Sequence, residues 1–211
     1  MLFNSEEYKN DTFNVGWKFW LPVLALYTGA RIEELCQLYI DDIKMEDGLW
    51  IFDINENKPD QKLKTNEKRY IPLHPFITDR LNFIEYAQNL PDQKGRLFPE
   101  LKPVGERKRY GHGPSTNWFP SYKKCCGVVA PKNKKTLHSF RHNVAACLME
   151  QDVQEYVIAM LMGHKHPQIS TGRYGQKFKP KEMMEKAVLK LNYNVDLSHL
   201  KNSKWVVKDR Q

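Results

Sequence analysis

The sequence predicts an α+β fold that is mostly helical and contains a small antiparallel β-sheet near its N-terminal third. Three observations support this prediction. The apolar run from Trp17 to Tyr27 ends at Thr28-Gly29, as buried helices with a glycine-assisted end do. Residues 43–73 change to strand-like runs that include an Asp-Gly turn signal. From residue 138 onward helical patterns return, and the first of them is amphipathic.

The size and composition fit one compact domain. The 211 residues suffice for one domain with a core and are short for two. Hydrophobic residues make up 41% and aromatic residues 12%, which is typical of a globular protein rather than a disordered chain. No internal repeat, low-complexity segment or linker separates a second domain. We therefore expect a single domain over residues 1–211.

The charge balance points to a polyanionic partner. The chain carries 33 Lys and Arg against 25 Asp and Glu, which gives a net charge of +8. An excess of this sign favours nucleic acid as the leading candidate. Charge alone does not decide between binding and no binding, because many basic proteins of this size bind no polyanion. The motifs must therefore identify the partner.

The cysteines and the first residues bear on location. Cys36, Cys125, Cys126 and Cys147 show no C-x-x-C spacing, which favours reduced thiols in a cytoplasmic compartment. The start, MLFNSEEYKNDTF, carries acids and lacks the basic residues and apolar stretch of a signal peptide. No apolar run of about 18 residues occurs. We expect a cytoplasmic protein with no membrane partner.

The first elements are two helices and a small sheet. After the helix over Trp17–Tyr27, a second helix over Arg31–Leu38 starts just past the glycine, so Arg31 occupies a helix start beside a tight turn. Asp47-Gly48 is a turn signal, and strand-like runs occur at residues 49–54 and 68–73. The polar, basic stretch DQKLKTNEK before the last strand suits a loop that projects toward solvent or a ligand.

The rest of the chain alternates helices with basic connectors. Residues 96–113 and 128–135 are irregular and basic. Asp152 is predicted to cap the helix that it opens, and Gly163 to end that helix. The predicted helices span residues 76–90, 115–125, 138–150, 152–161 and 181–191.

The motif HSFRH places an imidazole and a guanidinium on one helix face. His138 and Arg141 lie three residues apart, and a guanidinium can bind two phosphate oxygens at once while staying charged. The alternative is that Arg141 pairs with a surface acid and His138 caps the helix. His138 and His142 have a metal-compatible spacing, but no HExxH signature or zinc-type cysteine spacing accompanies it. We expect no metal.

A histidine and a tyrosine follow ten residues apart. His164 comes directly after Gly163, and Tyr174 lies between Arg173 and a glycine in a short basic stretch. A phenol has an ordinary pKa of about 10, so a nucleophilic tyrosine needs nearby cations and a base. Without such surroundings Tyr174 is an ordinary packed or exposed tyrosine.

In order and spacing, TGARIEEL, a lysine near the sheet, HSFRH, LMGH and the tyrosine resemble the catalytic domain of the tyrosine recombinase (phage integrase) family. The likeness covers roughly residues 17–193. It implies a site-specific recombinase or integrase that cleaves and rejoins DNA through a 3′-phosphotyrosyl intermediate. Such an enzyme needs no cofactor, because the phosphotyrosyl bond conserves the energy of the diester.

The resemblance also implies roles for individual residues. Arg31 and Arg141 would clamp the scissile phosphate, His164 would hydrogen-bond it, His138 would act as base, and Tyr174 would attack phosphorus. Lys64 would be the general acid that protonates the departing 5′-oxygen, with Lys62 and Lys68 as competitors. Glu34 would orient the active-site cations from behind.

Two basic segments are candidates for DNA binding. Their phosphate contacts would position DNA without specifying bases. The alternative is that each is a solvated run of charges. The candidate residues are Arg107, Lys108, Arg109, Lys132, Lys134 and Lys135.

The resemblance implies a setting as well. The partner would be a double-stranded DNA recombination site. The protein would bind it as a homotetramer and would be a monomer off DNA. Its location would be the cytoplasm of a bacterial host. No small-molecule substrate is expected. The event would be integration or excision of a phage or mobile element. Family members usually carry an N-terminal core-binding domain, which we expect to be absent here, with weaker DNA binding as the result.

Two other functions fit part of the pattern. A type IB topoisomerase-like enzyme that nicks and reseals DNA would share the arginines, the lysine and the tyrosine. A DNA-binding regulator without catalysis would keep the fold and bind DNA without cutting it.

Overall fold

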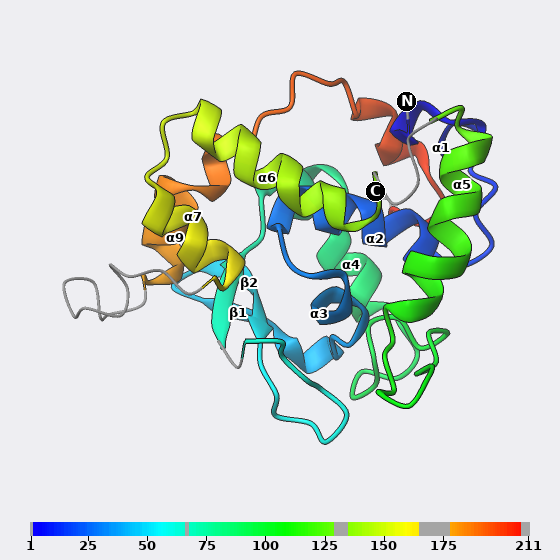
Figure 1. The fold of residues 1–211 in the computed structure, drawn as a ribbon, viewed down its shortest axis with the longest axis horizontal. Helices are drawn as coiled ribbons and strands as arrows, with labels where there is room; N and C mark the ends of the chain where they lie inside the picture. The colour runs from blue at the N-terminus through cyan, green and yellow to red at the C-terminus, as the bar shows by residue number, and fades with distance from the viewer. Residues whose placement is uncertain (1, 66–67, 129–134, 165–177, 208–211) are drawn as a thin grey trace.

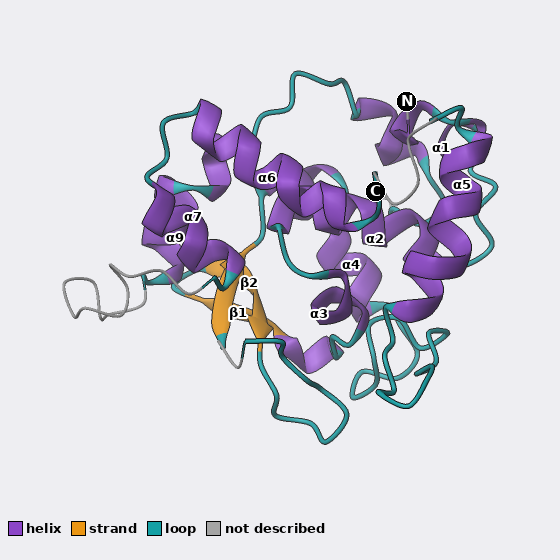
Figure 2. Ribbon diagram, viewed as in Figure 1, coloured by secondary structure: helices purple, strands orange, loops and turns teal. Residues whose placement is uncertain are grey.

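The computed structural model describes residues 2–65, 68–128, 135–164 and 178–207, and its elements make an α+β fold (Figures 1 and 2). Short 3₁₀ or π segments occur at residues 2–4, 40–42, 76–80, 113–118, 188–190 and 198–202. The helices and strands are α1 (Glu6–Lys9), α2 (Gly16–Thr28), α3 (Ile32–Cys36), β1 (Ile43–Glu46), β2 (Leu49–Ile54), β3 (Arg69–Pro72), α4 (Phe83–Gln88), α5 (Phe119–Cys125), α6 (His138–Glu150), α7 (Glu155–Met162) and α9 (Pro180–Lys186).

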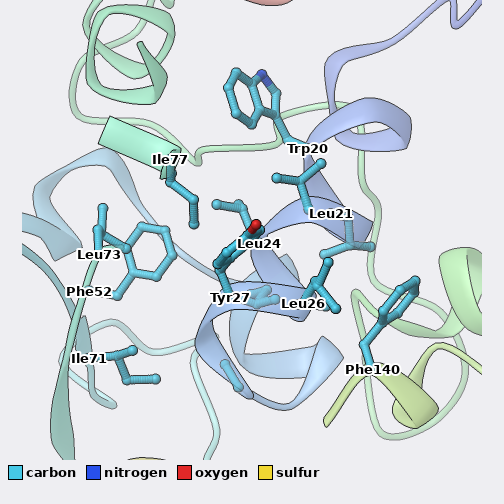
Figure 3. Close-up of a cluster of buried hydrophobic side chains, with 14 of the residues drawn as sticks. Trp20, Leu21, Leu24, Leu26, Tyr27, Phe52, Ile71, Leu73, Ile77 and Phe140 are labelled. Carbon is cyan, nitrogen blue, oxygen red and sulfur yellow. The ribbon is translucent and has the colours of Figure 1, made fainter. Parts of the chain in front are cut away.

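The helix α2 runs through the middle of the core. Nearly all of its side chains are buried, as expected for a helix that is apolar on all sides. Figure 3 shows its side chains between Phe52 and Ile71 of the sheet on one side and Phe140 of α6 on the other. The helix α6 lies across α2 (Figure 1), so the end of α2 and the start of α3 are fixed by packing from both sides.

The three strands form an antiparallel sheet in the order β1-β2-β3. Asp47 and Gly48 connect β1 to β2 with φ angles of 52° and 76°, the left-handed pair that a two-residue hairpin turn requires. The strand β3 pairs with β2 through Ile71 and Phe52, and α7 and α9 pack against β3. The sheet thus brings the loop between β2 and β3 next to the end of α7.

Two predicted helices are interrupted. Residues 76–90 form a π segment and then α4, with a break at Asn82, whose φ is 47°. Asparagine tolerates this left-handed conformation, and the break lets Ile77 and Phe83 both point into the core. The predicted helix over residues 181–191 likewise ends at Lys186 and continues as a separate 3₁₀ turn.

The prediction that Asp152 caps the next helix is wrong. Asp152 has a φ of 54°, and its N–H donates to the carbonyl of Met149 at 3.1 Å, while the N–H of Val153 donates to that of Leu148 at 2.9 Å. These are the bonds of a Schellman motif, so Asp152 closes α6 instead. The helix α7 begins three residues later, after Gln154.

The segment after α9 returns to the first residues of the chain (Figure 1). The hydroxyl of Tyr193 donates to the carbonyl of Leu26 at 2.5 Å, and that of Ser203 to Asp11 at 2.6 Å. Buried apolar side chains such as Leu200 accompany these bonds. Within the described ranges, none of the helices has the length and apolar character needed to cross a membrane.

Candidate active site

The first arginine is placed by the turn between α2 and α3. Thr28 closes α2 by donating its hydroxyl to the carbonyl of Leu24 at 2.7 Å, and Gly29 then takes a φ of 62°. Arg31 is the N-cap residue of α3, and its N–H donates to Oε2 of Glu34 at 2.8 Å. Its guanidinium Nη1 lies 3.0 Å from Oε1 of the same carboxylate. The residues TGARIEEL therefore fix both the main chain and the charge of Arg31.

The second arginine is held by backbone carbonyls rather than by a surface acid. Arg141 is 2% exposed on the first turn of α6. Its Nη1 donates to the carbonyl of Gly29 at 2.5 Å and its Nη2 to that of Met162 at 2.5 Å. Burial, followed by the charge of Arg31, lowers the pKa of Arg141 to about 9, so the guanidinium stays charged at neutral pH.

His164 touches the guanidinium of Arg141. Its Nε2 lies 2.7 Å from Nη2 of Arg141. Because arginine only donates, Nε2 accepts here and the ring proton lies on Nδ1. Burial, and then the charges of Arg141 and Arg31, lower the pKa of His164, which favours this neutral form. The main chain is fixed too, because the N–H of His164 donates to the carbonyl of Ala159 at 2.8 Å.

Three arginines converge on the carboxyl end of α7. The carbonyl of Leu161 accepts from Nε of Arg69 at 2.9 Å, that of Met162 from Arg141, and that of Gly163 from Nη2 of Arg31 at 3.4 Å. The last carbonyls of a helix lack partners within the helix and carry partial negative charge, so they suit cations. The end of one helix thus organises guanidinium groups from three other elements.

Arg69 was missed by the sequence predictions. It forms a two-pronged ion pair with Glu34, at 2.7 Å from Nη2 to Oε2 and 3.2 Å from Nη1 to Oε1. Burial alone would raise the pKa of Glu34, but the charges and hydrogen bonds of Arg69 and Arg31 hold it below its ordinary value. A signal was present: Arg69 and the apolar Ile71 are two residues apart and so lie on the same face of the strand, and a charge on a core face requires a partner.

The balance of these charges favours an anionic ligand. Arg31, Arg69 and Arg141 contribute three positive charges, and Glu34, which pairs with two of them, contributes one negative charge. The excess of two positive charges is held by fixed partners, so these groups need little rearrangement when an anion arrives. The site therefore suits a negatively charged group.

Gly163 is required by two features of the same site. Its φ is +66°, and it closes α7 with the bond pattern of a Schellman motif. A Cβ at this position would lie 2.7 Å from Nη1 of Arg69. The glycine therefore lets Arg69 approach the end of α7 and orients His164, which follows it.

His138 is an exposed residue at the start of α6. Its ring centroid lies 5.0 Å from that of His142. Partial burial lowers the pKa of His138, and the nearby positive groups, His142 and Arg141 first, lower it further. The N-cap residue is Leu137, whose side chain makes no capping hydrogen bond; Oγ of Ser139 accepts from the N–H of Thr136, before the helix, at 2.9 Å. His138 is thus kept neutral and uncommitted to the cap.

Lys64 lies on the exposed part of the loop between β2 and β3. Its positive charge is the last of the causes that lower the pKa of His138. The hydroxyl of the next residue, Thr65, donates to the carbonyl of Gly163 at 3.3 Å, so the loop is attached to the end of α7. Among its competitors, Lys68 lies 3.4 Å from Oδ1 of Asn57, and Lys62 has an exposed side chain.

The remaining predicted residues lie apart from this cluster or outside the described ranges. Arg107, Lys108 and Arg109 are exposed on a turn closed by pairing of Val104 with Arg109, and Lys135 is exposed before α6. Three predicted residues are not among the described ones: Tyr174, Lys132 and Lys134.

A family model and several known proteins match this chain. The model, described as the Phage integrase family, matches residues 17–181. Tyrosine recombinase XerA of Pyrococcus furiosus is 31% identical over 148 residues, which cover 68% of this chain and 45% of that protein. XerA of Thermococcus kodakarensis is 28% identical over 151 residues, which cover 69% and 46%. The chain therefore spans about half the length of the curated relatives it matches.

Solved structures share the fold. The integrase from mycobacterium phage Brujita matches with a TM-score of 0.55 and 18% identity, over 98% of this chain and 60% of that one. XerH site-specific recombinase, in a pre-cleavage complex with its difH substrate, matches with a TM-score of 0.50 and 19% identity, over 86% and 52%. At these identities the likeness concerns the fold, and it confirms the predicted α+β arrangement.

Proposed function

The chain belongs to the phage integrase family, as its motifs predict, and on that premise we propose that it is the catalytic domain of a site-specific DNA recombinase. One observation carries the proposal: Arg31, Arg141 and His164 meet at the carboxyl end of α7. These groups come from three separate parts of the chain, and they are the groups that the family resemblance assigns to the scissile phosphate.

The two arginines and His164 would bind the phosphate. Guanidinium groups held by carbonyls and by Glu34 are already oriented before DNA arrives, and they stabilise the charge that builds up on the non-bridging oxygens. When a phosphate oxygen takes the place of Nε2 of His164 beside Arg141, the imidazole is free to contact the same phosphate. The clamp thus exchanges one internal contact for contacts with substrate.

The covalent step would use Tyr174, His138 and Lys64. The phenol oxygen of Tyr174 attacks phosphorus, and His138, which its surroundings keep neutral, takes the phenol proton. The bond from phosphorus to the 5′-oxygen breaks, and Lys64 gives that oxygen a proton. The products are a 3′-phosphotyrosyl linkage and a 5′-hydroxyl, and attack by a 5′-hydroxyl from another strand reverses the step without a cofactor.

The partner would be a double-stranded DNA recombination site. XerH site-specific recombinase, which has a related fold, is bound to its difH substrate, and this supports the choice. The exposed turn with Arg107, Lys108 and Arg109 would contact phosphates, together with Lys132, Lys134 and Lys135. The protein would be a homotetramer on DNA and a monomer when DNA is absent. Residues 1–211 would act as one catalytic domain. Its role would be integration or excision of a phage or mobile element in a bacterial cytoplasm.

Covalent capture tests this function. The chain is incubated with a pool of nicked duplexes that carry a randomised segment beside the nick, so that cleavage releases a short strand and traps the enzyme. We expect a covalent protein–DNA band on a denaturing gel, and sequencing of the trapped DNA then defines one site. The band should vanish in Tyr174→Phe.

The same assay separates the alternatives. A band that persists in Tyr174→Phe would show that the nucleophile is another residue. DNA that is bound but never cut would support a regulator, and relaxation of a plasmid carrying the site without recombinant products would support a topoisomerase-like enzyme.

A further inference from the structure

The loop between β2 and β3 is long, yet its central residues are held in place. Lys64 is the tenth residue after Ile54, the end of β2. A flexible loop of this length would leave the lysine ammonium group in many positions, and ordering it during catalysis would cost conformational entropy. The four residues directly before Lys64, residues 60–63, are instead each held by a hydrogen bond to a side chain of the fold or of the loop itself.

The first of these attachments involves Gln37, the residue that ends α3. Its carboxamide accepts the N–H of Lys62 at 2.9 Å and donates to the carbonyl of the same residue at 3.2 Å. Gln37 is 3% exposed. A buried amide that pairs with both backbone groups of one residue acts like a neighbouring strand, so the main chain of Lys62 has one position relative to α3.

A second attachment holds Asp60. Its carboxylate accepts the hydroxyl of Tyr39 at 2.9 Å and that of Tyr110 at 3.0 Å, and it forms an ion pair with Arg96. The guanidinium of Arg96 in turn lies 3.6 Å from the ring centroid of Tyr110. Tyr39 follows α3, and Arg96 and Tyr110 lie between α4 and residue 113, so Asp60 is held by groups from two other parts of the chain.

The residues on either side complete the restraint. Nε2 of Gln61 donates to Oδ2 of Asp42 at 2.7 Å. Leu63 is 6% exposed, and its N–H donates to Oε1 of Glu56 at 2.8 Å. Lys64 therefore follows directly after a segment whose main chain is anchored and whose last side chain is buried.

One short helix carries both the phosphate clamp and the loop anchor. Arg31 is the N-cap of α3, and Gln37 is its C-cap. We propose that Gln37 is a positioning residue that holds the loop at Lys62, so that Nζ of Lys64 reaches the departing 5′-oxygen of a phosphate bound by Arg31. This inference rests on the proposed function, since it takes Lys64 as the general acid. Asp60 supports the same loop through its bonds to Tyr39, Arg96 and Tyr110.

The test compares two leaving groups on the duplex defined by covalent capture. One substrate has the natural 5′-oxygen at the scissile position, and the other has sulfur there. A thiol leaves without a proton from the enzyme because its pKa, about 8.5, is far below that of an alcohol. We expect Gln37→Ala to slow single-turnover cleavage of the oxygen substrate by about 10-fold or more and that of the sulfur substrate by less than about 2-fold.

Control variants separate a positioning role from a general loss of structure. Gln93→Ala is the matched control, since Gln93 also bonds backbone carbonyls through its amide, here those of Gln88 and Leu90 at the end of α4. It should leave both rates unchanged. Asp60→Ala loosens the same loop at a half-exposed position and should repeat the pattern of Gln37→Ala.

Two failures are distinguishable. If Lys64→Ala is slow on both substrates, Lys64 is not the acid, and the proposed roles fail first. The second failure concerns the positioning role and applies when the sulfur substrate restores the rate of Lys64→Ala. That role is overturned if Gln37→Ala and Asp60→Ala keep the wild-type rate, or if they are equally slow on both substrates. Should Gln37→Ala fail to fold, the result with Asp60→Ala decides by the same criterion.

Discussion

The carboxyl end of α7 and the loop between β2 and β3 present charge in opposite ways. At the end of α7, buried guanidinium groups bind main-chain carbonyls and one buried carboxylate directly. On the loop, Lys64 is exposed, and the bonds that place it are made by residues before and after it. In the roles proposed above, the arginines hold an anion and can be locked in place, whereas Lys64 gives a proton and must keep access to the departing atom. Substitution of the buried arginines should therefore have large effects. On the loop, substitution of the residues that hold Lys64 in place should matter as well.

The largest effect is expected at Arg141. Arg141→Ala should reduce covalent cleavage by about 10³-fold, because an anchored donor to the transition state is lost. Arg141→Lys keeps a charge but cannot contact two carbonyls with the same planar fork, and it should recover only part of the rate. Single-turnover cleavage measures both, with circular dichroism to show that the variants are folded. A rate for Arg141→Ala near that of the wild type would remove it from the phosphate clamp.

The next effect concerns stability. Arg69→Ala leaves Glu34 buried and without its main partner, which should lower the free energy of unfolding by about 3–5 kcal/mol. Lys58→Ala breaks the exposed ion pair with Asp41 and should change the free energy of unfolding far less, because solvent screens that pair. Urea unfolding of the two variants gives the comparison. Equal losses would mean that burial does not distinguish the two pairs.

A smaller effect is expected from a pair of glycines. Gly163 and Gly48 both have positive φ, but a Cβ on Gly48 meets nothing within 4 Å, whereas one on Gly163 lies 2.7 Å from Arg69. Both Ala variants carry a backbone cost of about 1 kcal/mol. Gly163→Ala should lose additional stability and should slow cleavage, and Gly48→Ala should leave cleavage unchanged. If the two variants have equal melting temperatures and equal cleavage rates, the contact with Arg69 is unimportant.

The smallest effect is a pH dependence. The pKa values of His138 and His164 lie below the ordinary value in the folded state, so the unfolded chain binds more protons once the pH falls below about 6.5. The free energy of unfolding should therefore fall as the pH is lowered from 7 toward the folded pKa values. Urea unfolding along this range measures the slope.

The double variant His138→Gln, His164→Gln should show a shallower slope over the same range. Glu34 acts at lower pH, because its lowered pKa gives stability that is lost only as the pH falls through that folded value. An unchanged slope in the double variant would assign the pH dependence to other groups.

Local patterns predicted the fold and much of the site. The apolar run of α2 ends at Thr28 as expected, and α6 has the predicted bounds of His138 and Glu150. These features depend on residues close together in sequence. The breaks at Asn82 and Asp152 were missed, because each depends on a left-handed residue whose neighbours could also continue or start a helix.

The missed site residues depend on distant partners. Arg69 pairs with Glu34 across 35 positions, and Gln37 binds the backbone of Lys62 across 25. Periodicity in either segment does not reveal which side chain meets which main-chain group. The position of Lys64 likewise depends on the folded sheet and on the bond from Thr65 to the carbonyl of Gly163 at the end of α7.

The most direct test identifies the atom that carries DNA. The covalent complex is digested with trypsin and nuclease, and the nucleotide-bearing peptide is sequenced by mass spectrometry. Trypsin cuts after Arg173 and Lys177, so the peptide YGQK isolates Tyr174. We expect a 3′-phosphonucleotide on Tyr174 in the wild type and no adduct in Arg141→Ala. An adduct on any other residue, or one that forms equally well without Arg141, would contradict a tyrosine nucleophile served by the arginine site at the end of α7.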